Sequence, residues 1–295
     1  MSVNSSGIES DMALDIEHLK QWIGRTESIT DVVTTTPLRA LAATLDRDDP
    51  APRPGDPVPP CWHWLYFLPV HPQSELGPDG HAKRGGFLPP VPLPRRMWAG
   101  SRCEFLRPLR VGDAIRRDSH IADVSGKQGR SGMLIFVNVR HEISDESGVA
   151  IVDEHDIVYR DDPKPGDPPV PTQLAPASHH WARTILPDDV LLFRYSALTF
   201  NGHRIHYDRR YATEVEGYPG LVVHGPLIAT LLLDLLRRNL PGATVARFSF
   251  RAMKPTFDLS PFKVCGRVDA NGRSVHLWAQ HADGAMAMDA TAFVT

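Results

Sequence analysis

The chain has 295 residues, of which 42% are hydrophobic and 23% charged, and its formal net charge is −3. This composition allows a hydrophobic core, and the charge balance excludes the basic field typical of nucleic-acid or anionic-membrane binding. The N-terminal stretch lacks the basic and apolar regions of a signal peptide, and Cys61, Cys103 and Cys265 are dispersed. We therefore expect a cytoplasmic protein with reduced thiols that binds neither nucleic acid nor membrane.

Proline clusters mark the irregular parts of the first half. The clusters at 49–60 and 88–94 predict long loops that flank the aromatic stretch Trp62–Phe67. After these loops, two segments that alternate apolar and polar residues are separated by a polar turn, a pattern typical of a β-hairpin. The segments and their turn are Ser131–Ile143, Ser144–Gly148 and Val149–Tyr159.

A third proline cluster, at 163–176, cannot sustain a helix or a central strand and predicts a semi-rigid linker. It separates two predicted domains, 8–162 and 177–295. The two halves also resemble one another, because Phe105–Leu109 and Ala252–Thr256 each place a cation before a proline and precede further strands. Similar short matches occur in the same order in both halves, which predicts an internal duplication.

The second half contains a long apolar segment with helical end signals. Pro226–Asn239 has proline in its first turn, arginines in its last turn and an almost wholly apolar surface, so we expect a buried helix. Asn271-Gly272 predicts a hairpin turn between the middle two of four strands. These strands are Val245–Met253, Phe262–Asp269, Ser274–His281 and Ala285–Val294. The pattern predicts an α+β fold with two hot-dog domains fused in one chain, each an antiparallel sheet wrapped around a helix.

Proton-transfer groups concentrate in Thr199–Asp208, whose sequence is TFNGHRIHYD. The segment Gly220–Pro226, GLVVHGP, follows it and leads into the apolar helix. A polar turn that carries histidines, followed by a glycine-led helix start, indicates an active site.

This pattern resembles the MaoC-like hydratases, whose signature has the form aromatic-x-x-S-G-D-x-N-P-x-H and often continues to x-D. In this chain the family histidine falls on His206, and the aspartate that caps the following helix falls on Asp208. The catalytic aspartate falls on Asn201 and the family asparagine on His203, which are departures at functional positions. The variant is similar to a fused double-hot-dog subgroup that includes mesaconyl-C4-CoA hydratases, itaconyl-CoA hydratases and fungal mitochondrial 3-hydroxyacyl-thioester dehydratases. The first half of that subgroup is a FAS1-like dehydratase domain.

The resemblance implies reversible hydration of an α,β-unsaturated acyl-CoA by the second half, with a non-catalytic first half. We expect mesaconyl-C4-CoA (3-methylfumaryl-CoA) or itaconyl-CoA to give citramalyl-CoA. His206 can act as base or acid because imidazole titrates near neutrality, and Asn201 can hold the water. His203 is the first candidate for the second proton. The Gly225 N–H is expected to donate to the thioester oxygen, with His224 beside it.

Other site expectations rest on charge and spacing alone. Arg251 and Lys254 are candidates for binding the CoA phosphates. We expect no metal, because the His203-x-x-His206 pair lacks a third ligand at a familiar spacing, and no cofactor besides the CoA of the substrate. Arg204 or Arg194 can pair with a substrate carboxylate. We expect a homodimer.

Alternatives stay open. His206 can be a structural imidazole bonded to backbone, and His203 an exposed surface residue. The protein can be a fatty-acid-type 3-hydroxyacyl-thioester dehydratase. It can also be a thioesterase, although Asp234, the only carboxylate of the helix, lies well past its start. The replacement of the family aspartate by Asn201 also allows a non-catalytic acyl-CoA-binding protein.

Overall fold

The computed structural model describes residues 15–129, 132–162 and 171–295. The helices are α1 Ile16–Lys20, α2 Thr35–Thr44, α3 Asp189–Leu198 and α4 Gly225–Asn239, with short turns η1 Trp62–Leu65, η2 Gln73–Glu75, η3 Arg204–His206 and η4 Tyr211–Val215. The first-half strands are β1 Thr26–Val32, β2 Arg95–Phe105, β3 Ala114–Gly129, β4 Gly132–Asp145 and β5 Gly148–Arg160. The second-half strands are β6 Trp181–Ile185, β7 Val245–Ala252, β8 Phe262–Val268, β9 Ser274–Gln280 and β10 Met286–Val294.

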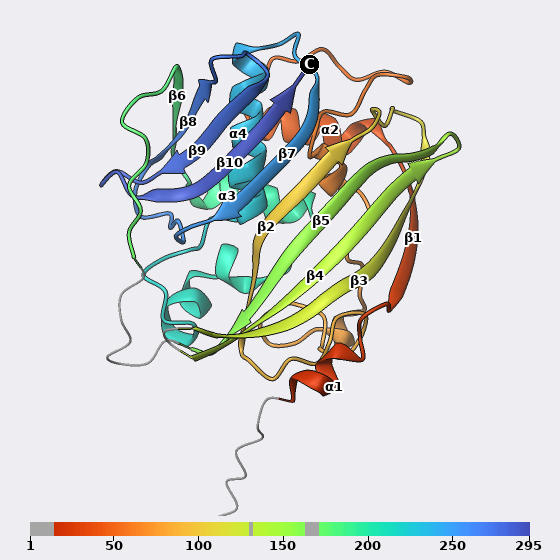
Figure 1. Ribbon diagram of the computed structural model, residues 1–295, viewed down its shortest axis with the longest axis vertical. Coiled ribbons are helices and arrows are strands. Elements are labelled where there is room, and N and C mark those ends of the chain that lie inside the picture. Colours follow the sequence, from red (N-terminus) through yellow and green to blue (C-terminus); the bar gives the residue numbers. More distant parts are fainter. Residues whose placement is uncertain (1–14, 130–131, 163–170) are drawn as a thin grey trace, which may run out of the picture.

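All the described strands belong to one antiparallel sheet with the order β1-β3-β4-β5-β2-β7-β10-β9-β8-β6. This order is symmetric about the central β2–β7 pair, in which Gly100 lies opposite Arg251 and Glu104 opposite Arg247. The sheet curves around α2, α3 and α4, which lie on its concave side (Figure 1). This symmetry is expected if the two halves arose by internal duplication. The predicted α+β fold, with an antiparallel sheet and helices in each half, is confirmed.

The elements predicted from hydrophobic periodicity are present within a few residues of their expected ends. The first-half hairpin is β4 and β5, and the four strands of the second half are β7 to β10. The turn between β8 and β9 contains Gly272 at φ +72°, a backbone conformation that glycine adopts without strain. The segments 49–60 and 88–94 are irregular loops, as predicted. Residues 163–170 of the predicted linker lie outside the described residues, so the domain boundaries stay a prediction.

One hydrophobic core serves both halves. Every residue of α4 from Leu227 to Leu236 is buried, which confirms the expectation of a buried helix. Leu41 of α2 and Trp62 of the aromatic stretch belong to the same cluster as these α4 side chains. A smaller cluster lies where α1 packs against β3 and β4. Among the described residues, no helix is both long and apolar enough to cross a membrane.

A charge cluster connects the helix core to both halves. The Asp234 carboxylate, in the middle of α4, is only 4% exposed. It accepts from Arg47 Nη1 at 2.6 Å, Arg183 Nη1 at 2.9 Å and Arg238 Nε at 2.7 Å. The guanidinium groups also donate to backbone carbonyls, including Leu45 O. Asp234 therefore neutralises arginines from both halves and stabilises the fold.

Replacing this carboxylate tests its role. Asp234→Asn keeps the shape but leaves the arginines without their shared anion. We expect the free energy of unfolding to fall by about 2–4 kcal/mol, less than for a fully buried pair because the arginines are partly exposed. Urea unfolding measures this change. Asp46→Asn is the control, since Asp46 is exposed and lies 4.0 Å from Arg183. An Asp234→Asn variant as stable as the control would contradict the assignment.

Candidate active site

Local hydrogen bonds shape the segment Thr199–Asp208, which lies between α3 and α4. The Asn201 Oδ1 accepts from the His203 N–H at 3.0 Å, which closes a tight turn. The chain then forms η3. The Asp208 carboxylate accepts from the Tyr211 N–H at 3.1 Å and from Arg204 Nη2 at 2.7 Å, at the start of the next helical turn. The segment is therefore held by its own polar side chains.

The GLVVHGP segment lies against this turn. The Val222 N–H donates to Ile205 O at 3.0 Å, and the Leu221 N–H donates to Asp258 Oδ1 at 2.9 Å. The Val223 N–H donates to Thr256 O at 2.8 Å, in the stretch between β7 and β8. These bonds place the start of α4 beside His206.

His206 is oriented by a backbone carbonyl. Its side chain is buried, and its Nδ1 lies 2.7 Å from Val222 O. A carbonyl only accepts, so Nδ1 carries the proton and Nε2 keeps its lone pair in the neutral ring. Among the described residues, Nε2 has no hydrogen-bond partner. Burial lowers the pKa of His206 to about 4, so the ring is neutral at physiological pH. This is the state of a general base.

His206 belongs to a row of imidazoles. Its ring stacks on His224 with centroids 3.7 Å apart, and His203 approaches edge-on at 5.3 Å. The His224 Nε2 lies 2.8 Å from Ser196 Oγ, whereas its buried Nδ1 has no partner among the described residues. Burial lowers the pKa of His224, and it lowers that of His203 to about 2. All three rings are therefore neutral near pH 7.

The first half contributes to this row, which the sequence interpretation missed. The His81 ring lies on His203 with centroids 4.1 Å apart, and its Nδ1 is 3.0 Å from Asp79 Oδ2. Burial lowers the pKa of His81, and Asp79 opposes this effect. Burial alone would raise the pKa of Asp79, but the hydrogen bonds and charge of His81 hold it below its usual value. The available signal was the Asp-Gly-His sequence at 79–81, in a loop rich in glycine and proline.

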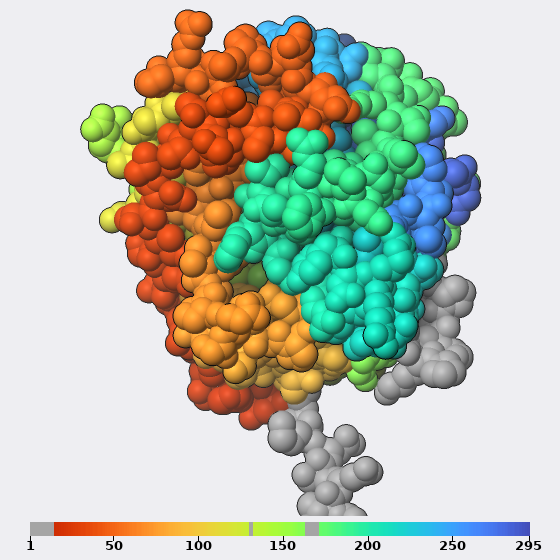
Figure 2. Space-filling view, turned by 180° about the vertical axis from the view of Figure 1, so that it is seen from behind, coloured from red at the N-terminus to blue at the C-terminus, as the bar shows by residue number. Residues whose placement is uncertain are grey.

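Backbone contacts fix the two loops against each other. The Arg204 N–H donates to Asp79 O at 2.9 Å, and Arg204 Nη1 donates to Pro78 O at 3.0 Å. A Cβ on Gly80 would lie 1.8 Å from Gly202 O, so only glycine fits there. On the face behind the sheet, the orange first-half segment lies directly against the teal second-half segment (Figure 2).

Asp79, His81 and His203 also have the donor types of a metal site. One donor atom from each lies within 4.8 Å of the others. However, the Asp79 carboxylate already accepts from both the ring and the backbone N–H of His81. Both Asp79 oxygens are therefore occupied by His81, which favours a hydrogen-bonded cluster over an ion site.

The start of α4 offers a backbone donor beside His206. Among the described residues, the Gly225 N–H has no acceptor. A Cβ on Gly225 would meet only Trp98 O, at 3.8 Å, so protein packing does not require glycine here. The open space and the positive end of the helix dipole suit the oxygen of a bound thioester.

The remaining predicted residues lie away from the row of imidazoles or are already paired. Arg251 is exposed on β7, opposite Gly100 and Asp289, and Lys254 Nζ lies 3.9 Å from Asp283. Their role in binding CoA stays a prediction. Arg204 is engaged by Asp208 and stacks over Tyr211, which removes it as a free partner for a substrate carboxylate.

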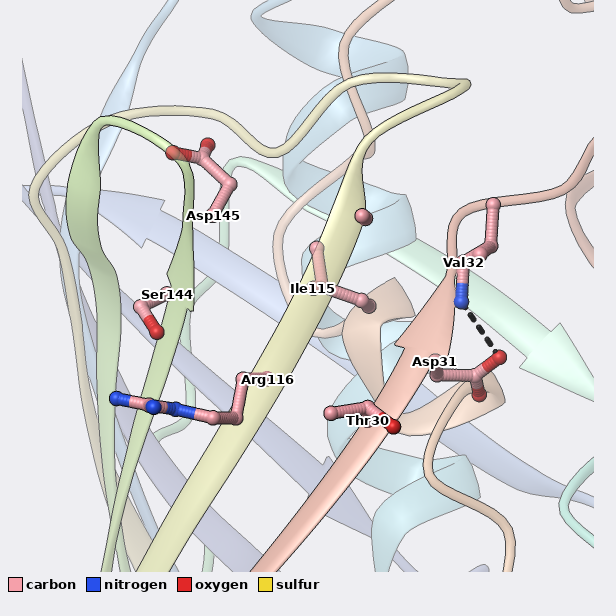
Figure 3. A pocket seen from close by; sticks show the side chains of 8 residues that line it. Thr30, Asp31, Val32, Ile115, Arg116, Ser144 and Asp145 are labelled. Atoms are coloured by element: carbon pink, nitrogen blue, oxygen red, sulfur yellow. Dashed lines mark hydrogen bonds between the residues drawn. The ribbon is translucent and has the colours of Figure 1, made fainter.

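A separate hollow lies at the sheet edge formed by β1, β3 and β4 (Figure 3). Asp31, Arg116, Ser144 and Asp145 are among the residues that line it. Asp31 accepts from the Val32 N–H, and Asp145 is paired with Arg107. Histidine is absent from its lining, so we place the candidate active site at the row of imidazoles.

Residues 61–258 match the family of hydroxyacyl-thioester dehydratase type 2. The mesaconyl-C(4)-CoA hydratase of Chloroflexus aurantiacus is 51% identical over 270 residues, which cover 92% of this chain and 95% of the relative. The mitochondrial hydroxyacyl-thioester dehydratase type 2 of Schizosaccharomyces pombe is 29% identical over 231 residues, covering 70% of this chain and 76% of the relative.

Solved structures agree on the fold. A MaoC-like dehydratase from Phytophthora capsici superposes with a TM-score of 0.67 at 15% identity, covering 96% of this chain and 98% of that structure. A Mycobacterium tuberculosis protein described as having a double hot-dog fold gives a TM-score of 0.58 at 15% identity, covering 92% and 96%. These likenesses establish the double hot-dog fold.

The depressed pKa of His206 predicts a pH effect on stability. Its folded pKa of about 4 lies below the ordinary 6.5, so only the unfolded chain gains this proton as pH falls from 6.5 towards 4. At about pH 5 this difference in proton binding lowers the free energy of unfolding by about 2 kcal/mol relative to neutral pH. His206→Asn removes this difference, so wild type should lose about that much more stability than the variant between about pH 7.5 and 5 in urea unfolding. An equal loss of stability in wild type and His206→Asn would contradict the depressed pKa of His206.

Proposed function

The chain belongs to the hydroxyacyl-thioester dehydratase type 2 family, and from this membership we propose that it is a hydro-lyase that hydrates an α,β-unsaturated acyl-CoA reversibly. The favoured substrate is mesaconyl-C4-CoA, with itaconyl-CoA as the close alternative, and the product is citramalyl-CoA. The observation that carries this proposal is the 51% identity, over nearly the whole length of both chains, to a mesaconyl-C(4)-CoA hydratase.

The geometry supports a general-base mechanism. In the proposal, His206 Nε2 takes a proton from a water molecule whose oxygen bonds to the β-carbon. The C=C electron pair moves towards the thioester, and the Gly225 N–H stabilises the oxygen as negative charge develops on it. The enolate pair then takes a proton at the α-carbon, so one water is added in total. Asn201, whose Oδ1 is engaged by the His203 N–H, can hold the water through Nδ2.

A cation beside the imidazoles supports a substrate with a free carboxylate. Burial is the main cause of the lowered pKa values of His81 and His203, and the charge of Arg96, at the start of β2, lowers them further. No ion pair joins Arg96 to a carboxylate within the described part of the chain. The half-buried Arg96 guanidinium is therefore a suitable partner for the free carboxylate of a C5 dicarboxylic acyl group. It replaces Arg204 as the candidate.

Two rival functions are less well supported. A thioesterase that used the acid of the central helix would need Asp234, which is buried among Arg47, Arg183 and Arg238. A fatty-acid-type dehydratase fits the family, but the S. pombe relative is 29% identical, against 51% for the mesaconyl-C(4)-CoA hydratase. The chemistry at His206 would be the same for both hydro-lyases.

The proposal includes a cytoplasmic homodimer with a CoA thioester as substrate and no resident cofactor or metal. Cys61, Cys103 and Cys265 are free and buried, which suits a reducing compartment. The halves 8–162 and 177–295 are proposed as the two hot-dog domains.

A panel of enoyl-CoA and 3-hydroxyacyl-CoA thioesters, both straight-chain and C5-dicarboxylic, tests the function. We expect a mass gain of one water with mesaconyl-C4-CoA or itaconyl-CoA, and no release of free CoA to a thiol reagent. His206→Ala should lower kcat by about 100-fold or more, since it removes the proton carrier. His71→Ala is the control, because that side chain is exposed and its Nδ1 lies 3.6 Å from the exposed Glu75. Normal hydration by His206→Ala would remove this histidine from the mechanism.

Asn201→Asp separates a water-holding residue from an acid. The variant restores the carboxylate of the family signature and keeps an oxygen for the His203 N–H. We therefore expect hydration within about tenfold of wild type, or faster, because a carboxylate also holds water and accepts protons. Asn201→Ala should be far slower. If Asn201→Ala matches wild type, Asn201 plays no part in the reaction.

A further inference from the structure

The loop 76–82 of the first half is built as a fixed support, not as a loose connection. Leu76 pairs with Ala82, the Gly77 N–H donates to His81 O at 2.7 Å, and the Gly80 N–H donates to Gly77 O at 3.1 Å. The contacts of Arg204 with Asp79 and Pro78 join this support to η3. His81 therefore keeps a defined position beside His203.

The carboxylate of this cluster comes from the first half. The signature residue at Asn201 cannot carry negative charge, and Asp208 is committed to Arg204 and the Tyr211 N–H. Asp79 contacts His81 directly, and its charge also acts on His203. An anion that orients an imidazole through Nδ1 is the arrangement that turns a histidine into an effective proton carrier.

The free ring nitrogen of His81 is available for chemistry. Its Nδ1 donates to the ionised Asp79, which leaves Nε2 without a partner among the described residues. The His81 side chain is 24% exposed, so a ligand or water can reach it. His203 separates His81 from His206, at centroid distances of 4.1 and 5.3 Å. Two oriented imidazoles, one from each half of the chain, therefore lie on either side of the His203 ring.

We propose that His81, oriented by Asp79, is the second proton-transfer residue of the site, so that the catalytic centre is shared by both halves of the chain. This inference rests on the proposed hydration. His206 takes the proton of the water as its oxygen bonds to the β-carbon. The protonated His81 gives its Nε2 proton to the α-carbon as the enolate pair forms the C–H bond. His206 then releases its proton to solvent and His81 regains one, so no net proton is consumed.

The active form therefore carries one proton between His81 and His206, and the anionic Asp79 balances its charge. The groups that face His81 are Asp79, His203, Arg84 and Arg96. Burial has the largest effect on the pKa of His81 and disfavours the protonated ring, as do both arginines, whereas Asp79 favours it. Activity should fall as pH rises and this shared proton is lost. Removing the Asp79 charge should move that alkaline limb to lower pH.

The test uses the full chain with the substrate hydrated by wild type. His81→Gln should lower kcat by about 100-fold with little change in KM. His81→Ala should regain activity when imidazole is added. Asp79→Asn should lower kcat by about tenfold or more and shift the alkaline limb of kcat/KM to lower pH, whereas Asp79→Glu should restore both in part. His71→Gln, in the exposed loop nearby, is the matched control.

The outcomes are separable. If wild type hydrates no thioester of the panel, both the proposed function and this inference are overturned. If wild type is active and His81→Gln stays within about twofold of it, only this inference is overturned. If the purified protein contains bound zinc and a chelator abolishes its activity, Asp79 and His81 would be metal ligands. That result would also overturn the role of His81 in proton transfer. Loss of activity in His81→Gln with an unchanged melting temperature supports the proposal.

Discussion

Five residues of β2, from Gly100 to Glu104, pair with five of β7, from Arg247 to Arg251, and this backbone pairing joins two sheets into one. The approach is so close that a Cβ on Gly100 would lie 2.5 Å from Phe250 O. The register of β2 and β5 shifts between Trp98 and Gly100, and Trp98 O lies next to Gly225, at the start of α4. Because loop 76–82 precedes β2 and the Thr199–Asp208 segment precedes β7, the central pair is what allows the two segments to meet.

Burial is the second constraint, because it decides the charge state of the imidazoles. Removing His206, His203 and His224 from water disfavours their cations, so each is neutral at physiological pH. A neutral ring with a fixed tautomer accepts a proton from water, which an imidazolium cannot do. The same burial makes the site costly in acid, since the unfolded chain then gains protons that the folded chain refuses. Burial of the imidazoles is therefore the common cause of their basicity towards water and of the expected loss of stability in acid.

The aspartates of the second half near the site are already committed. Asp208 binds Arg204 and caps a turn, Asp234 binds arginines in the core, and Asp258 binds Arg209 and the Leu221 N–H. These ion pairs fix the backbone that carries His206 and Gly225. Releasing Asp208 or Asp234 for catalysis would leave half-buried arginines without their anion. Supplying the charge from Asp79, in the other half, avoids that conflict.

The sequence by itself determined the strands β4, β5 and β7 to β10 and the buried helix α4, and it singled out His206 as the candidate histidine. Alternation at 131–143 and 149–159 and the apolar surface of 226–239 depend on local periodicity, which a single chain displays directly. The segment Thr199–Asp208 pointed to His206 through its resemblance to a family signature, which is also contained in a short stretch of sequence. The contribution of His81 could not be predicted, because its 122-residue separation from His203 is closed by long-range packing, including the β2–β7 pairing and the Gly80–Gly202 contact. Partners brought together by long-range backbone packing leave no periodic signal, so only the tertiary structure decided which groups share the site.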